Sequence, residues 1–422
     1  MFEKKDEYFP IKQSPACQLK WTWSTLWITE GATNSCHRCK LVSLDKINFD
    51  NFHNLPLKIK EREIMLSGKW PTVENGGSGH CTYCKDIEDT GGMSDRLHHL
   101  TIPNQTPKEL FTDPTATSVT PKILEVFMNA TCNLKCTYCN TRESSQWRSE
   151  VKKYGPLKYQ NGDIIKGYDE KTNHPDTEFF FKKTLNWIEK NGNQLKRLHL
   201  LGGEPFYQTE LQEMLDTLKK LKNPNLELNI VSNLMVKENT YKNYIEQIKK
   251  LCKDRRIGRF DLTCSIDGWG VEAEYARFGL KLDNWEKLFS YTVDQKWIYL
   301  NINQTITSLT MKTMIDLQKI INGYRKKRTI NQHMSFVGNR IWMHPKVYGY
   351  KFWSNDIDKF LDEMPEDNKK NIVSKKYMAG MLKSIPDIVA DQKQISMLKF
   401  FLDELDKRRN TNWRKVFPYL DI

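Results

Sequence analysis

The chain has 422 residues, of which 39% are hydrophobic and 28% are charged. This balance is typical of a globular protein with enough apolar material to bury a core, and the length favours two or three domains. No apolar run approaches membrane-spanning length, and residues 1–7 are polar and mixed in charge. We therefore expect a cytoplasmic protein without a membrane span or signal peptide. The net charge of +13 is spread over predicted helices in short tracts, so we do not expect a nucleic-acid partner.

Residues 1–118 look irregular apart from one helix near 56–67, and they end in a linker-like stretch at 112–115. We interpret them as a small Cys-rich module. It contains two CxxC pairs, Cys36 with Cys39 and Cys81 with Cys84. The ten cysteines of a cytosolic chain favour metal ligands over disulfides. Two CxxC pairs favour one four-thiolate site, for zinc or for an iron–sulfur cluster. The alternatives are two independent structural pairs or a redox disulfide.

Residues 119–345 alternate between predicted strands and helices. The strands are expected at 123–128, 197–201, 226–232, 260–266, 297–306 and 334–343. The helices between them are expected at 177–190, 209–222, 238–252, 283–292 and 310–324. Six strands of βα type predict an α/β fold with a parallel sheet, either barrel-like or open and doubly wound. Segment 140–176 is a long polar insert that we interpret as a substrate-covering loop.

Residues 346–422 are predicted to be helical, with amphipathic stretches near 354–364, 367–383 and 391–408. This C-terminal extension contains no cysteine. We expect it to pack against the α/β core without holding metal. The isolated cysteines, Cys17, Cys252 and Cys264, are interpreted as small buried hydrophobic residues.

Three further cysteines follow the first strand of the α/β region in a CxxxCxxC pattern, as Cys132, Cys136 and Cys139. Three thiolates on one short loop suit a cubane cluster with one iron left open. A structural zinc site needs a fourth ligand, and no histidine lies at ligand spacing from the loop. Catalytic groups of barrel-like α/β folds also sit at the carboxyl ends of strands. The loop therefore predicts a [4Fe–4S] cluster with an open coordination position.

With the aromatic Tyr138 before its last cysteine, this loop resembles the signature of the radical S-adenosylmethionine (SAM) superfamily. The resemblance implies a partial (β/α)6 TIM-like barrel over 119–345. It also implies that the open iron binds the methionine part of S-adenosylmethionine. One-electron reduction then yields a 5′-deoxyadenosyl radical that abstracts a hydrogen atom from the substrate.

Motifs at later strand ends extend the resemblance. Gly202, Gly203 and Glu204 resemble the family's GGE motif, whose backbone contacts the amino group of the cofactor. The sequence Ser265-Ile266-Asp267-Gly268 resembles the "SIDG" strand end of the SPASM- and twitch-related enzymes. By this resemblance Ser232 and Asn233, together with Ser265 and Arg277, are expected at the ribose or carboxylate of the cofactor. Local reasoning alone allows each to be a turn or a cap.

The N-terminal module is similar to the twitch-type modules of these enzymes, although it precedes the α/β core and relatives often carry theirs at the C-terminus. The resemblance favours an auxiliary [4Fe–4S] cluster over zinc at Cys36, Cys39, Cys81 and Cys84. The ligands by themselves leave both metals open.

The function expected from the resemblance is a radical SAM enzyme that modifies a peptide or protein side chain. The alternatives are a radical SAM enzyme acting on a small molecule (a sugar, nucleotide or cofactor precursor) and, more remotely, a zinc- and nucleic-acid-binding protein. An electron donor such as flavodoxin or ferredoxin is the expected partner. The sequence does not identify a catalytic acid, base or radical-relay residue.

Overall fold

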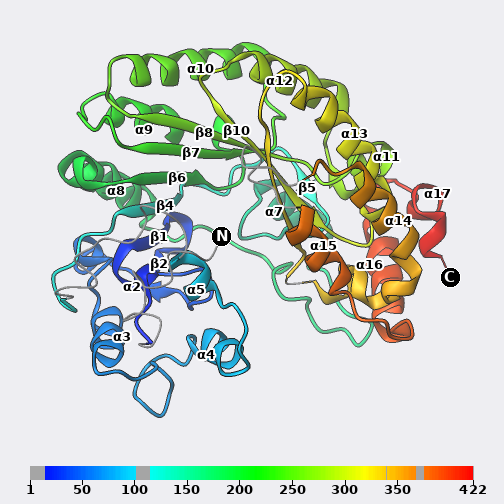
Figure 1. Ribbon diagram of the computed structural model, residues 1–422, viewed down its shortest axis with the longest axis horizontal. Helices are drawn as coiled ribbons and strands as arrows, with labels where there is room; N and C mark the ends of the chain where they lie inside the picture. The colour runs from blue at the N-terminus through cyan, green and yellow to red at the C-terminus, as the bar shows by residue number, and fades with distance from the viewer. Residues whose placement is uncertain (1–14, 101–114, 339, 367–374, 422) are drawn as a thin grey trace.

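The computed structural model describes residues 15–100, 115–338, 340–366 and 375–421. Within these ranges the centre of the molecule is a nine-stranded sheet of order β11-β10-β8-β7-β6-β4-β1-β2-β3 (Figure 1). The strands from β11 to β1 all run parallel, and β2 and β3 are antiparallel additions at one edge. The structure is therefore a mixed α/β fold with a large parallel sheet.

The six strands expected between 119 and 345 are all present. They are β4 (Ile123–Phe127), β6 (Arg197–Leu201), β7 (Glu227–Ser232), β8 (Arg259–Ser265), β10 (Tyr299–Ile306) and β11 (Asn331–Phe336). The prediction for the last strand is wrong over 337–338 and 340–343, because the strand ends at Phe336. Trp342 and Met343 are buried in a second hydrophobic core with the C-terminal helices. These two apolar side chains therefore pack against the C-terminal helices and do not lie in a strand.

The connecting helices also match the sequence pattern. They are α8 (Thr177–Asn191), α9 (Glu210–Leu218), α10 (Glu238–Lys253), α12 (Leu282–Asp294) and α13 (Met314–Arg325). Figure 1 shows them following one another along the outside of the sheet. In α10 the buried residues Tyr241, Ile245, Ile248 and Leu251 recur every three or four positions, which forms one apolar stripe toward the sheet.

Segment 15–100 is more regular than its sequence suggests. It forms α2 (Gln18–Thr22), β1 (Trp23–Trp27), β2 (Ala32–Asn34), β3 (Val42–Ser43), α3 (Pro56–Leu66), α4 (Thr82–Asp89) and α5 (Asp95–Leu100). Strand β1 pairs in parallel with β4 along its whole length, from Trp23 opposite Ile123 to Trp27 opposite Phe127. The N-terminal segment therefore continues the sheet of the α/β region. The linker-like stretch at 112–115 lies outside the described residues except for Thr115.

The C-terminal residues form a group of helices at the other end of the molecule (Figure 1). These are α14 (Tyr350–Glu363), α15 (Lys375–Lys383), α16 (Gln392–Arg409) and α17 (Trp413–Val416). Together with α7 (Ser145–Tyr154) and α11 (Val271–Ala276) they enclose the second hydrophobic core. Among the described helices none has the length and apolar character needed to cross a membrane.

Candidate active site

The CxxxCxxC loop lies directly after β4 and contains the short strand β5 (Lys135–Cys136). Cys132 and Cys136 are buried and Cys139 is half-buried, and all three belong to one cluster of apolar contacts. Burial raises the pKa of all three thiols, and in Cys139 the neighbouring Glu143 and the other two thiols raise it further. The structure thus gathers the three sequence-predicted ligands in one place.

The donor set fits an iron–sulfur cluster. The Leu134 N–H donates to Cys132 Sγ at 3.4 Å, an interaction that stabilises a thiolate. In the described part of the chain, no three His, Cys, Asp or Glu side chains are grouped as a single-ion site. A cubane needs a wider arrangement, because each thiolate binds a different iron atom.

The two glycines after β6 let the next turn lie against the start of the cysteine loop. The Gly203 N–H donates to Asn129 O and the Glu204 N–H donates to Thr131 O, both at 2.9 Å. A Cβ at Gly203 would lie 2.3 Å from Thr131 O, and one at Gly202, where φ is +139°, would lie 2.4 Å from Asn129 O. Glycine is therefore required by this close backbone approach. The expected contact with a cofactor stays a prediction.

The Glu204 side chain is fully buried and links the ends of β6 and β7. It accepts hydrogen bonds from Asn233 N at 2.6 Å, Ser232 Oγ at 2.9 Å and Phe206 N at 3.1 Å. Burial outweighs these donors and raises the pKa of Glu204 to about 7. The Ser232 hydroxyl also accepts from Leu234 N. Glu204 and Ser232 thus hold the turn that carries Asn233.

Asn233 turns toward the cysteine loop. Its amide donates to Asn133 Oδ1 at 3.1 Å and lies 3.9 Å from Cys132 Sγ. Of the polar residues predicted at the end of β7, Asn233 is the one whose side chain contacts a predicted cluster ligand, Cys132. Ser265, at the end of β8, is half-buried and pairs with Asn303 across the sheet.

Arg277 lies opposite Cys136 in the two-stranded pairing of β5 with β9 (Arg277–Phe278). Its guanidinium binds Asp267 through two hydrogen bonds, Nε to Oδ2 at 2.9 Å and Nη2 to Oδ1 at 2.8 Å. Burial alone would lower the pKa of Arg277, but Asp267 raises it well above its ordinary value. Tyr138 OH and Thr305 N also donate to the same carboxylate, at 2.7 and 2.9 Å. Two of the Arg277 nitrogens are thus engaged within the protein.

A second buried ion-pair group was missed by sequence reasoning. Glu150 on α7 binds Arg409 at the end of α16 (Nε to Oε2, 3.1 Å) and Lys135 in the cysteine loop (2.7 Å). Trp147 Nε1 donates to Cys136 O at 2.9 Å. The C-terminal extension therefore supports the loop through Glu150 on α7, as well as packing on the core. Nothing in the local sequence links Glu150 to a residue 259 positions away.

The two N-terminal CxxC pairs also come together. Cys36, Cys39, Cys81 and Cys84 line one small cavity, with Cys17 beside them. Hydrogen bonds from the Cys36 and Cys81 thiols, together with the Lys20 charge, hold the pKa of Cys39 well below its ordinary value. Lys20 Nζ donates to Cys39 Sγ at 3.1 Å.

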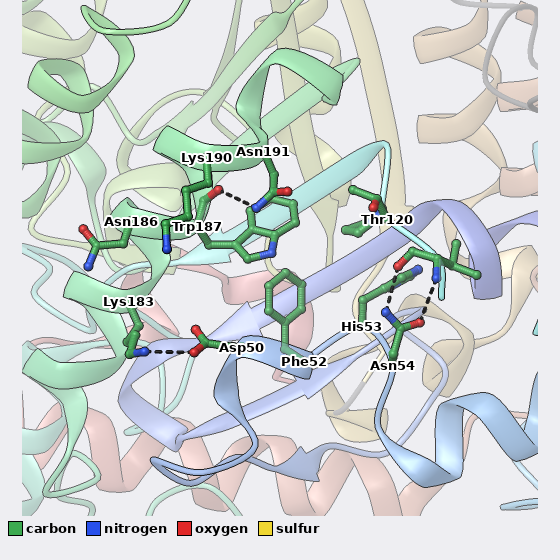
Figure 2. A pocket seen from close by; sticks show the side chains of 12 residues that line it. Asp50, Phe52, His53, Asn54, Thr120, Lys183, Asn186, Trp187, Lys190 and Asn191 are labelled. Carbon is green, nitrogen blue, oxygen red and sulfur yellow. Dashed lines mark hydrogen bonds and ion pairs between the residues drawn. The ribbon is translucent and has the colours of Figure 1, made fainter. Parts of the chain in front are cut away.

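A larger cavity of about 420 Å³ lies between the N-terminal segment and α8 (Figure 2). Two polar contacts join residues of its lining: Lys183 binds Asp50 at 2.9 Å, and the Asn191 amide donates to Trp187 O at 3.0 Å. None of its lining residues is a cysteine or a sequence-predicted site residue. We therefore do not assign it to the active site.

Residues 126–278, which include the three-cysteine loop, the Gly-Gly-Glu turn and Arg277, match the family model described as "Radical SAM superfamily". None of the curated proteins shows significant sequence similarity to this chain. Two solved structures, described as "Native anSMEcpe with bound AdoMet" and the same protein "with bound AdoMet and Cp18Cys peptide", are 16% identical to it. Their TM-scores are 0.34 and 0.32; each match covers 57% of this chain, and 58% and 56% of theirs. A radical SAM domain implies a [4Fe–4S] cluster and S-adenosylmethionine. The similarity to the radical SAM superfamily is thus located in residues 126–278 of this chain.

Proposed function

We propose that this protein is a radical SAM enzyme whose Cys132, Cys136 and Cys139 hold a [4Fe–4S] cluster. The observation that carries the proposal is the gathering of three thiols at the end of β4, inside the segment that matches the family model. When bound, the cluster and S-adenosylmethionine would supply the one-electron cleavage that yields a 5′-deoxyadenosyl radical and the abstraction of a substrate hydrogen atom.

The protein's own contribution is to position these groups. Seven residues are proposed to border the cofactor: Gly202, Gly203, Glu204, Ser232, Asn233, Ser265 and Arg277. Of these, Glu204 and Ser232 act by holding the Asn233 turn, whereas Asn233 and Arg277 present N–H donors beside the cysteine loop. The Asp267 carboxylate keeps the Arg277 guanidinium in one orientation, which suits directional recognition of a carboxylate.

The proposed arrangement has a twitch-like module at 1–118, a (β/α)6 core at 119–345 and a helical extension at 346–422. The module is proposed to hold an auxiliary [4Fe–4S] cluster at Cys36, Cys39, Cys81 and Cys84, with zinc as the alternative metal. Supporting this, the four thiols line one cavity and a buried ammonium group contacts Cys39. Positive charge beside the sulfurs offsets the charge of a four-thiolate centre.

The proposed substrate is a peptide or protein side chain, and the proposed reductant is a flavodoxin or ferredoxin in the cytoplasm. An auxiliary centre would serve this reaction by accepting the electron left on a product radical or by orienting the substrate. The polar insert at 140–176, which includes α7, is proposed to border the substrate.

The test of the central proposal is anaerobic reconstitution with iron and sulfide, followed by dithionite and S-adenosylmethionine. The wild type is expected to release 5′-deoxyadenosine, measured by liquid chromatography with mass detection. A Cys132→Ala/Cys136→Ala/Cys139→Ala variant is expected to release none, and Cys252→Ala, which removes a half-buried thiol outside the loop, is expected to behave as wild type. Absence of 5′-deoxyadenosine from fully loaded wild-type protein would reject the proposal.

The metal of the N-terminal site is decided by elemental analysis of a variant with alanine at Cys36, Cys39, Cys81 and Cys84. An auxiliary cluster predicts a fall in iron and sulfide, whereas unchanged iron with a loss of zinc would exclude it. Mass spectrometry of candidate peptides encoded next to the gene, after the anaerobic reaction, tests the substrate class. Modification of a sugar or nucleotide with no change in any peptide would favour the small-molecule alternative.

A further inference from the structure

A cavity of about 310 Å³ opens beside the four N-terminal cysteines, between α3 and the strands β2 and β3. It shares Lys20, Cys39 and His80 with the lining of the cysteine cavity. One wall is apolar, formed by Leu41, Val42 and Leu57, and the remainder is polar. Three lysines (Lys20, Lys40 and Lys58) line it against one carboxylate, Glu61.

The Glu61 carboxylate is already engaged. Lys20 and the Ser78 hydroxyl both bind it, and Ser78 N donates to it at 3.2 Å. Lys20 also donates to Cys39. The one acidic side chain of this lining therefore has its partners within the protein.

Lys58, in contrast to Lys20, has neutral hydrogen-bond partners, and only 3% of its surface is exposed. Its ammonium group donates to Thr33 Oγ1 at 2.9 Å and to Ser24 Oγ at 3.2 Å, which uses two of its three protons. No carboxylate of the described residues lies within ion-pair distance of it. Among the described residues, its buried neighbour Arg62 binds carbonyl and amide oxygens and no carboxylate, so it adds further positive charge.

A second buried polar residue belongs to the same lining. Ser35 is 2% exposed, and among the described residues its Oγ makes no hydrogen bond. Burial, together with the charges of Lys20 and Arg62, lowers the pKa of Lys58 well below its ordinary value, so its charged form is disfavoured unless an anion binds beside it. A buried hydroxyl without a partner is also costly unless a ligand satisfies it. Both requirements are met by one group that is anionic and accepts hydrogen bonds.

We propose that this cavity binds the carboxylate of a small aliphatic acid or of an acidic side chain, with Lys58 as its ion-pair partner. Ser35 Oγ donates a hydrogen bond to the same carboxylate, and the wall of Leu41, Val42 and Leu57 covers the aliphatic part of the ligand. The inference rests on the lining of this cavity and does not depend on the radical chemistry proposed for Cys132, Cys136 and Cys139.

The test is isothermal titration of the full-length protein, with its metal content as purified, using butyrate as the probe and butyramide as its neutral analogue. Wild type is expected to bind butyrate and to bind butyramide at least about tenfold more weakly. Lys58→Met is expected to weaken butyrate binding about tenfold to a hundredfold, the effect of losing a hydrogen bond to a charged group. The matched control is Lys60→Met, the same change at an exposed position of α3 outside the cavity lining.

Three results would overturn the proposal: no butyrate binding by wild type, equal binding of butyramide, or unchanged binding by Lys58→Met. If Lys58→Met does not fold, Ser35→Ala takes its place, and unchanged butyrate binding in that variant rejects the site. A short peptide with one glutamate distinguishes the two sources of the carboxylate. Tighter binding of the peptide than of butyrate identifies an acidic side chain as the ligand, and the reverse order identifies a free acid.

Discussion

The Asp267–Arg277 pair should make one of the largest single contributions to the stability of the candidate site. The two side chains are 0% and 7% exposed, and the carboxylate accepts four hydrogen bonds, two of them from the guanidinium. Replacing Asp267 by Asn removes the negative charge and turns an NH2 group toward donors. The Arg277 charge then remains buried without compensation.

Breaking a buried ion pair by removing one partner costs about 3–5 kcal/mol of unfolding free energy. We expect Asp267→Asn to lower the unfolding free energy of the protein by about that amount. The double variant Asp267→Asn/Arg277→Met removes both charges, so it should lose less than the sum of the two single variants. The difference, which is the coupling energy, should be about 2–3 kcal/mol.

Equilibrium urea denaturation of the wild type, both single variants and the double variant measures this cycle. Glu189→Gln is the control, since its pair with Lys220 is exposed and should contribute less than about 1 kcal/mol. A loss below about 1 kcal/mol for Asp267→Asn, or strictly additive single effects, would refute the reasoning. Across these variants, iron retention should fall as the unfolding free energy falls, because Arg277 lies opposite Cys136.

Three further predictions concern the supports of the cysteine loop. Gly203→Ala should prevent stable cluster loading, measured as iron per chain, because the added Cβ would lie 2.3 Å from a carbonyl oxygen of the loop. The control is Gly323→Ala, whose Cβ would meet no atom within 4 Å. It should load normally and raise the melting temperature. The raised pKa of Glu204, about 7, means that its contribution to stability is full below its ordinary value near 4.5 and is lost as the pH rises through 7. That loss is about 3 kcal/mol in all, and the unfolding free energy of Glu204→Gln should vary less over this pH range. Arg409→Met should lower the unfolding free energy by about 3 kcal/mol and reduce iron retention. Arg414→Met removes an exposed ion pair and should change both quantities little. Equal effects of the two changes would contradict the support assigned to the C-terminal extension.

Local patterns predicted the parallel strands well, since hydrophobic runs and turn residues are properties of adjacent positions. Two elements show where this reasoning failed. Strand β1 was not predicted, because Trp23–Trp27 becomes a buried strand only by pairing with β4, a hundred residues later. The apolar residues at 341–343 were assigned to a strand, yet they pack among the C-terminal helices. In both cases the decisive partner lies far away in sequence.

The candidate site shows the same contrast between local sequence patterns and contacts between distant residues. The sequence by itself predicted Cys132, Cys136 and Cys139 as the ligand loop, because three residues on one loop are related by spacing alone. Only the tertiary structure decided what surrounds them: Glu204 beneath the Asn233 turn, Asp267 holding Arg277, and Arg409 supporting the loop through Glu150. It also brought Lys58 and Ser35 to one cavity beside the N-terminal cysteines. These contacts join separate elements, so they arise from how the chain packs, which no local spacing encodes.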